Sequence, residues 1–269
     1  MYWQKRFDRM NKDQEIEEQI KNVFEENHGN FGYRRIYAQL RSQGLLVNKK
    51  KIRRIQKKLS IKCMKFTRKS RKFSTYKGTV GKVADNLIRR RFKTNIAHQK
   101  LTTDTSEFKY YETDSTGKMV IKKAYLDPFL DIYNSEIISY RFSEKLNSKA
   151  IMDALNEAIE KTNDCPYRRT IHSDQGWAYQ MNGYRKKLKV NKIFHSMSRK
   201  GNCLDNSPME NFFSLMKQEM YYGEIYCSFE DLKQAVDEYI YWYNNKRIKE
   251  KLGWKSPVGF RQLNERKIA

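Results

Sequence analysis

Apolar residues recur at helical spacing in the first sixty positions of the chain. In residues 13–26 the apolar positions share one face of a helix, and acidic residues occupy the other face. Residues 33–41 and 48–59 repeat this spacing and are separated by a turn through Gly44, with Asn48 suited to cap the second of them. The pattern predicts three short amphipathic helices.

From residue 100 the pattern changes to short runs typical of β-strands, interleaved with helical segments. Strands are predicted at residues 101–111, 129–133, 136–143, 168–174 and 192–198. Helices are predicted at residues 148–161, at 179–188, from Pro208 onward, and at 229–243. The order βββαβαβαα indicates an α/β domain, a mixed five-stranded sheet flanked by helices on both faces.

These patterns divide the chain into four parts. We expect a small all-α domain over residues 1–60, a basic linker over 61–97, an α/β core over 98–226, and a C-terminal helix and tail over 227–269 that complete the core. In the first part, two short helices joined by a glycine turn, the second of them rich in cations, are typical of helix-turn-helix DNA-binding domains. The alternative is that the cations form only a solvated helix face.

The charge of the chain is unevenly distributed. The net charge is +24, and residues 1–100 hold 28 Lys and Arg against 8 Asp and Glu, whereas residues 101–269 hold 27 against 23. So lopsided a charge favours a polyanionic partner, because each neutralised phosphate releases a counterion. Nucleic acid is the preferred partner; an acidic membrane surface, or solubility alone, is the alternative.

Several classes of protein are excluded by composition. No apolar run approaches the roughly 18–20 residues needed to span a bilayer, and the N-terminus has no apolar core of a secretion signal. The four cysteines form no C-x-x-C pair, so neither a zinc finger nor a disulfide framework is indicated. We therefore expect a cytoplasmic protein with reduced thiols.

Three carboxylates stand where catalytic acids are found in α/β proteins. Asp104 interrupts the first predicted strand, Asp174 ends the fourth, and Glu210 opens a helix, with 35 residues between Asp174 and Glu210. If the two strands are neighbours, the three acids repel one another unless divalent cations join them. Oxygen ligands suit Mg²⁺ or Mn²⁺, and a pair of such ions supports in-line displacement at phosphorus.

Each acid also has a purely structural interpretation. Asp104 could pair with a lysine, and Asp174 could begin an Asx turn before Gly176. Ser207 and Glu210 have the spacing of a Ser-x-x-Glu capping box, with Ser207 as the N-cap and Pro208 at the first helical position. Spacing alone leaves these alternatives open.

Four longer motifs resemble one protein family. The stretches "HSDQGWAYQ", "SMSRKGNCLDNSPMENFF" and "YIYWYNNKRIKEKLGWKSPVGF" resemble the catalytic subunit of bacterial insertion-sequence transposases, whose core is similar to that of retroviral integrases. The stretch "NFGYRRIYAQLRSQGLLVNKKKIRRIQKKLSI" resembles the helix-turn-helix region that precedes this core. The resemblance implies a ribonuclease-H-like fold and a D, D(35)E triad, matched here by Asp104, Asp174 and Glu210, with two Mg²⁺ or Mn²⁺ ions in each active site.

The family pattern also includes a basic residue seven positions after the glutamate, matched by Lys217. Two departures are visible: Leu101 stands where members usually have Trp, and Gln175 where they often have Arg. Neither removes a metal ligand. The cations that we expect to contact DNA are Lys217, Arg34, Arg35, Lys49, Lys50, Lys51, Arg53, Arg54, Lys57, Lys58, Arg199 and Lys200.

The resemblance implies a transposase subunit that binds the inverted-repeat ends of a mobile element and catalyses DNA strand cleavage and strand transfer into target DNA. It further implies a homo-oligomer on DNA, a location in the bacterial cytoplasm with the nucleoid, and an upstream-frame protein joined by frameshifting. Two alternatives remain: a DNA-binding regulator that keeps the fold but does not cut, and a ribonuclease acting on RNA–DNA hybrids.

Overall fold

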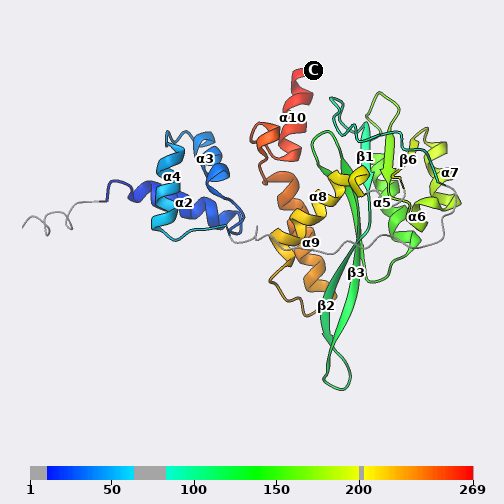
Figure 1. The fold of residues 1–269 in the computed structure, drawn as a ribbon, viewed down its shortest axis with the longest axis horizontal. Coiled ribbons are helices and arrows are strands. Elements are labelled where there is room, and N and C mark those ends of the chain that lie inside the picture. The colour runs from blue at the N-terminus through cyan, green and yellow to red at the C-terminus, as the bar shows by residue number, and fades with distance from the viewer. Residues whose placement is uncertain (1–10, 64–82, 200–202, 269) are drawn as a thin grey trace, which may run out of the picture. The chain divides into compact units, whose positions relative to one another are not determined.

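The computed structural model describes residues 11–63, 83–199 and 203–268 (Figure 1). The chain divides into two compact units, Met1–Lys69 with Ile248–Trp254, and Ser70–Arg247 with Lys255–Ala269. Among the described residues, no helix combines the length and apolarity needed to cross a membrane.

The first unit is a bundle of three helices, α2 (Gln14–Glu26), α3 (Tyr33–Ser42) and α4 (Lys49–Lys58). Its core consists of buried apolar side chains from all three, among them Ile20, Val23, Ile36, Leu40, Ile52 and Ile55. Asn48 caps α4 as predicted, because its side chain accepts a hydrogen bond from the Lys50 backbone N–H at 2.8 Å. The segment Ile248–Trp254 joins this unit through a short 3₁₀ helix, η3 (Glu250–Leu252).

The second unit contains a mixed sheet of six strands. They are β1 (Lys100–Thr103), β2 (Ser106–Thr113), β3 (Met119–Asp131), β4 (Ile137–Ser143), β5 (Thr170–Ser173) and β6 (Phe194–Met197). β3 pairs antiparallel with β1, β2 and β4, whereas β1, β5 and β6 run parallel to one another.

β1 and β2 occupy a single place in this sheet. Leu126 pairs with both Ser106 in β2 and Phe142 in β4, and Phe129 pairs with both Thr103 in β1 and Ser139 in β4. β1 and β2 therefore lie on the same edge of β3, and they share one unbroken register. The six strands fill five positions across the sheet, which agrees with the predicted five-stranded arrangement.

The interruption between β1 and β2 has a cause on β3. The shared register places Pro128 opposite Asp104, and the Ile132 N–H, on the same edge, donates to the Lys100 carbonyl at 2.9 Å. Alternate residues of a strand face the same edge, so the proline offers no N–H where the ladder would continue. Asp104, expected within a strand, instead lies in a gap between two strands, and Pro128 lies inside β3.

Helices cover both faces of the sheet (Figure 1). On one side lie α5 (Ser148–Lys161), α6 (Trp177–Gln180) and α7 (Asn182–Val190), and on the other lie α8 (Ser207–Met216) and α9 (Phe229–Asn245). The 3₁₀ helix η1 (Cys203–Asn206) leads into α8, the π-helical turn η2 (Lys217–Tyr221) follows it, and α10 (Pro257–Ile268) ends the chain. The main core lies between the sheet and α5, where Leu101, Phe129 and Ile171 meet Ile151 and Leu155.

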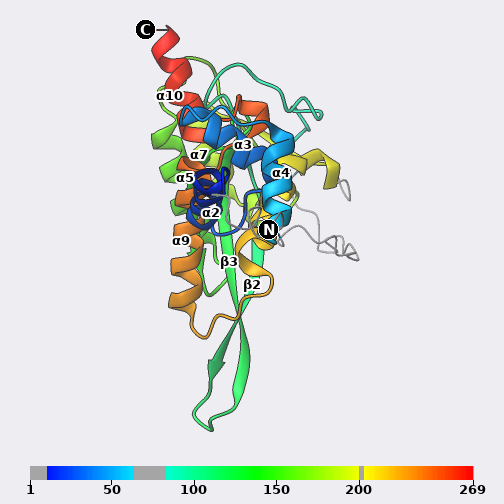
Figure 2. The ribbon, with the colours of Figure 1, turned by 90° about the vertical axis from the view of Figure 1, so that its left-hand side faces the viewer.

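β2 and β3 extend together beyond the helices as a hairpin (Figures 1 and 2). Met119 and Ile121 near its tip are 63% and 61% exposed. Because this half of β3 has no buried face, it lacks the alternation from which strands are predicted. The predicted strand at 129–133 missed the first ten residues of β3, and the lack of a buried face accounts for the first five of them, 119–123.

Candidate active site

Two acids emerge side by side at one end of the sheet. Asp104 directly follows β1 and Asp174 directly follows β5, and these strands are parallel neighbours with Thr102 opposite His172. Equal positions at the carboxyl ends of adjacent parallel strands bring both side chains to the same edge, where α/β proteins place their sites. The neighbouring strands on which the sequence argument depended are therefore present.

Glu210 approaches the same edge from the first turns of α8, which packs against β1. Burial, followed by the charge of Asp174 and then that of Glu210, raises the pKa of Asp104 well above its ordinary value. Burial also raises the pKa of Asp174 and of Glu210. Asp174 and Glu210 thus each lie close enough to Asp104 for their charges to act on its carboxyl group in partly desolvated space.

No cation compensates this cluster within the part of the chain that the structure describes. The Asp104 Oδ1 atom accepts a hydrogen bond from the Thr105 N–H at 2.8 Å, and the Asp174 Oδ1 atom accepts one from the Gly176 N–H at 2.8 Å. Across residues 11–63, 83–199 and 203–268, no three His, Cys, Asp or Glu side chains already stand in an arrangement that could hold a metal ion. The fold brings the acids together, but their side chains do not yet converge on one point.

The Asx turn considered for Asp174 is formed. A β-carbon on Gly176 would lie 2.8 Å from the Asp174 Oδ1 atom, so only glycine leaves room for this carboxylate. The turn fixes the aspartate's orientation at the end of β5.

The capping box predicted at the start of α8 is wrong. Asn206, not Ser207, is the N-cap residue, and the helix start has no side-chain cap. The Asn206 side chain instead crosses to β1, where it accepts a hydrogen bond from the Thr102 hydroxyl and donates one to the Thr103 carbonyl at 3.2 Å. Glu210 is one residue further into the helix than a capping box requires, and its carboxylate makes no bond to the helix start.

Lys217 lies at the point where α8 gives way to the π-helical turn. Its ammonium group donates to the Glu107 carbonyl at 2.8 Å and sits 4.8 Å from the centre of the Phe108 ring. The side chain therefore reaches across to β2.

A fourth acid, Asp127, was missed by the sequence analysis. It lies in β3, is 1% exposed, and its charge contributes to the raised pKa of Asp104. Its Oδ1 atom accepts a hydrogen bond from the Thr105 hydroxyl at 2.5 Å, whereas its Oδ2 atom is buried without a partner. Burial raises the pKa of Asp127 to about 6. The signal used for Asp104, an acid inside a predicted strand, did not reach Asp127 because the second strand was predicted only from residue 129.

The cations of α4 fall into two sets. Lys51 and Arg54 bind Asp13 at 2.7 and 2.5 Å, and Lys58 binds Glu17 at 2.6 Å. These three cations are thereby directed toward the N-terminal part of α2.

The second set lies on the part of α4 that faces α3 and solvent. Arg53 lies over the Tyr33 ring and Lys49 over the Tyr37 ring, with cation-to-centroid distances of 5.9 and 4.9 Å. Lys50 and Lys57 are exposed, and in the described residues no carboxylate pairs with any of these four cations.

Comparison with known proteins decides the family. A family model described as an HTH-like domain matches residues 11–70, and two described as an integrase core domain match residues 94–203 and 210–264. A relative from Escherichia coli (strain K12), named "Putative transposase InsK for insertion sequence element IS150", is 38% identical over 92% of this chain and 83% of its own length. The chain belongs to the insertion-sequence transposases. An "Uncharacterized transposase-like protein" of Haemophilus influenzae is 42% identical to this transposase over 80% of the chain and 93% of that protein.

Membership confirms three expectations for this transposase: the helix-turn-helix domain, the integrase-like α/β core and the enzyme class. A solved structure titled "Structure of the HTLV-2 integrase catalytic core domain in complex with magnesium (dimeric form)" aligns with 61% of the chain and 97% of that chain, at 15% identity and a TM-score of 0.43. So weak a likeness carries no argument about the site.

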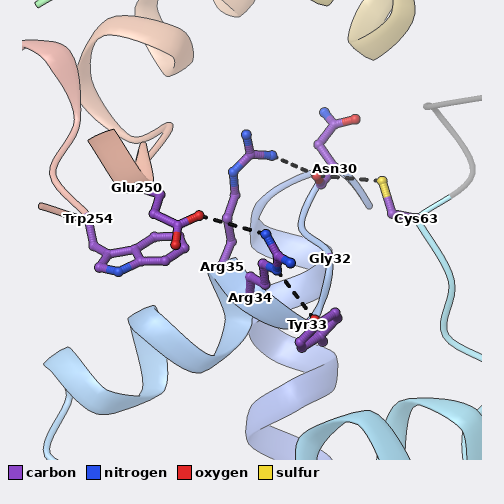
Figure 3. Close-up of a pocket in the computed structure, with 8 residues that line it drawn as sticks. All are labelled: Asn30, Gly32, Tyr33, Arg34, Arg35, Cys63, Glu250 and Trp254. Atoms are coloured by element: carbon purple, nitrogen blue, oxygen red, sulfur yellow. Dashed lines mark hydrogen bonds and ion pairs between the residues drawn. The ribbon is translucent and has the colours of Figure 1, made fainter. Parts of the chain in front are cut away.

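Two further cations of the transposase, Arg34 and Arg35, line a pocket of about 390 Å³ in the first unit (Figure 3). Its wall is formed by Asn30, Gly32, Tyr33, Arg34, Arg35, Cys63, Glu250 and Trp254. Arg35 donates to the carbonyls of Asn30 and Ile248 at 3.3 and 3.2 Å, which ties the segment Ile248–Trp254 to α3. Arg34 is 66% exposed and lies 3.9 Å from Glu250. Arg35 thus has a structural role, whereas Arg34 is accessible.

The remaining expected DNA contacts are Arg199 and Lys200. Arg199 binds the buried carboxylate of Asp205, with its Nε atom 2.9 Å from Oδ2, and its side chain is still 61% exposed. Lys200 lies outside the described residues, as does most of the predicted linker.

Proposed function

We propose that this transposase binds the inverted-repeat ends of a mobile element and catalyses cleavage and transfer of DNA strands at Asp104, Asp174 and Glu210. The observation that supports this proposal is the meeting of three carboxylates, from β1, β5 and α8, without a compensating cation among the described residues. Repulsion of this kind costs folding free energy, and a divalent cation would relieve it.

The donor set fits Mg²⁺ or Mn²⁺, because all three side chains supply carboxylate oxygen. When two such ions are bound, they supply activation of the attacking oxygen and stabilisation of the leaving oxygen. The protein's own residues orient the ligands: Gly176 holds Asp174 through its N–H, and the Thr105 N–H holds Asp104.

The proposed reaction consists of two displacements at phosphorus. In the first, a water oxygen forms a bond to the phosphorus at the element end, and the bond from phosphorus to the 3′ oxygen breaks. In the second, the freed 3′-hydroxyl attacks a target phosphate, and a target 3′-oxygen leaves. Neither step needs a covalent bond between protein and DNA, so no tyrosine or serine nucleophile is assigned.

Binding of double-stranded DNA is assigned to the helix-turn-helix unit. We propose that α4 enters the major groove with Lys49, Lys50, Arg53 and Lys57 toward DNA, because Lys51, Arg54 and Lys58 are engaged by acids of α2 and its N-cap. We propose that Arg34 contacts the backbone of the same DNA, and that Lys217 and Arg199 contact the DNA at the active site.

On this proposal, residues 1–60 bind DNA, 61–97 form the linker, and 98–226 together with 227–269 carry the chemistry. The transposase would act as a homo-oligomer on the bacterial nucleoid in the cytoplasm, with the upstream-frame protein or its frameshift fusion as partner. Pairing of two element ends gives an oligomer a physical purpose, since each end needs its own binding unit.

The test is Mg²⁺-dependent nicking and strand transfer on DNA that carries the element's own ends. Wild type is compared with Asp174→Asn and with Asp153→Asn, a matched change on α5 at the opposite face of the sheet from α8. We expect Asp174→Asn to bind DNA normally and to lose cleavage by at least about a thousandfold, a loss typical of removing a group that acts in the transition state. Asp153→Asn should cut like wild type.

Two results would replace the proposal. If wild type binds element ends but cuts under neither Mg²⁺ nor Mn²⁺, the protein is a DNA-binding regulator. If wild type cleaves RNA–DNA hybrids and does not join DNA, it is a ribonuclease.

A further inference from the structure

Asn206 stands at a helix start but does not cap it. Asparagine is among the best N-cap residues, and a side-chain cap typically contributes about 1 kcal/mol. At the start of α8 the Asn206 side chain instead binds β1, and the helix has no side-chain cap. An interaction with β1 has therefore replaced the local one.

The two bonds of Asn206 join the two elements that carry acids. Its Oδ1 atom accepts from the Thr102 hydroxyl, and its Nδ2 atom donates to the Thr103 carbonyl. That carbonyl belongs to the peptide group that leads into Asp104, and Glu210 follows Asn206 by one helical turn. The amide is 3% exposed, so both bonds are shielded from water.

Asp205 anchors the 3₁₀ helix η1, which contains both Asp205 and Asn206. Its carboxylate is buried and accepts hydrogen bonds from Asn86 Nδ2 at 3.0 Å, Arg90 Nε at 2.8 Å, and Arg199 N and Nε at 3.1 and 2.9 Å. η1 is thus held to the segment before β1 and to Arg199, two residues after the end of β6.

We propose that Asn206 is a positioning residue, which holds Glu210 at a set distance from Asp104 and thereby sets the affinity of the site for divalent cations. This inference rests on the proposed function. The three carboxylates push α8 away from the strand ends, and the Asn206 amide opposes that movement. A neutral amide can do so without adding another charge to the cluster, because its oxygen accepts from Thr102 while its nitrogen donates to Thr103.

The test measures metal binding without DNA, from the thermal unfolding midpoint of the full chain as a function of Mg²⁺ or Mn²⁺ concentration. We expect Asn206→Ala to need about tenfold more metal than wild type to reach half of the metal-induced rise in the unfolding midpoint. Mutation of groups that orient metal ligands typically changes metal affinity 10- to 100-fold. In nicking assays, raised Mg²⁺ should restore much of the lost kcat, with KM for DNA unchanged.

Asn244→Ala is the matched control. Asn244 on α9 also binds a strand through both amide atoms, accepting from the Ile137 N–H and donating to the Ile137 carbonyl, each at 2.9 Å. Its loss should lower the unfolding midpoint in the absence of metal but leave the metal concentration at half effect within about twofold of wild type.

The outcomes separate the two proposals. If wild type responds to metal and Asn206→Ala shows the same half-effect concentration, the positioning role is overturned while the metal site stands. If wild type does not respond to either ion, the proposed metal site fails, and the positioning role with it.

A second variant covers the case in which Asn206→Ala does not fold. Thr102→Val keeps the branched shape of the strand residue and removes only the hydroxyl that binds Asn206. We expect about a threefold rise in the half-effect metal concentration, and an unchanged value would overturn the positioning role.

Discussion

Replacing Asp127 by asparagine tests whether a buried, ionising acid lies beside the proposed site. Burial raises its pKa from 3.8 to about 6. Because the folded-state pKa exceeds the unfolded one, the folded protein binds more protons between these values, and stability falls as pH rises from about 4 to about 6. A shift of about two units corresponds to about 3 kcal/mol, of which about 2 kcal/mol develops between pH 4.5 and 7.5.

Asparagine does not titrate, so Asp127→Asn should escape this loss. The new amide group replaces an Oδ2 atom that has no partner, and its unsatisfied N–H groups cost about 1–3 kcal/mol at every pH. The informative quantity is therefore the free energy of unfolding of the variant minus that of wild type, followed as pH changes. From pH 4.5 to 7.5 this difference should grow by about 2 kcal/mol in favour of the variant. Loss of the Asp127 charge also lowers the pKa of Asp104, so the variant again loses less stability than wild type as pH rises.

The assay is urea unfolding of both proteins without divalent cations at several pH values in this range. Asp153→Asn, on α5, provides the control, and its free energy of unfolding should change with pH as that of wild type does. If the free energy of unfolding of Asp127→Asn also changes with pH as that of wild type does, Asp127 is not a buried acid that ionises in this range. The electrostatic account of the strand ends is then refuted.

Two other predictions concern the DNA-binding helix and the core. Arg53→Ala should weaken DNA binding several-fold and reduce the slope of log affinity against log salt concentration by about one. Arg54→Ala should change the affinity less than about twofold, because the Arg54 guanidinium binds Asp13 at 2.5 Å. The reverse order of effects would show that the other side of α4 faces DNA. Arg247→Met leaves the buried Glu219 without its bidentate partner at 2.6–3.1 Å and should cost about 3–5 kcal/mol in urea unfolding. Adding Glu219→Leu should recover most of this loss, and an additive double mutant would contradict the pairing.

Local spacing was enough to predict most helices and strands, although not α10, and to select the three acids as candidates. The family resemblance, not spacing, joined those acids as a triad. The cap at Asn48 formed as expected because its partner, the Lys50 N–H, is two residues away. Asp174 formed its Asx turn with Gly176 for the same reason. In these two cases both partners lie within one turn of chain, and the predicted bond formed.

Partners far apart in the chain could not be predicted in this way. Asn206 binds Thr102 and Thr103 across about a hundred residues, and this contact displaced the capping box expected from local spacing. Pro128 interrupts the strand containing Asp104 only because β1 and β2 share its edge of β3.

Sequence by itself determined which residue types recur at which spacing, and hence the α/β class and the helix-turn-helix region, and it nominated the three acids as candidates. Only the tertiary structure decided which cations of α4 remain open to a partner, that Asp127 joins the acids, and how the start of α8 is attached to β1. The physical reason is competition: each polar side chain can satisfy only a few hydrogen bonds or charges, and packing of distant segments decides which of the available partners it meets.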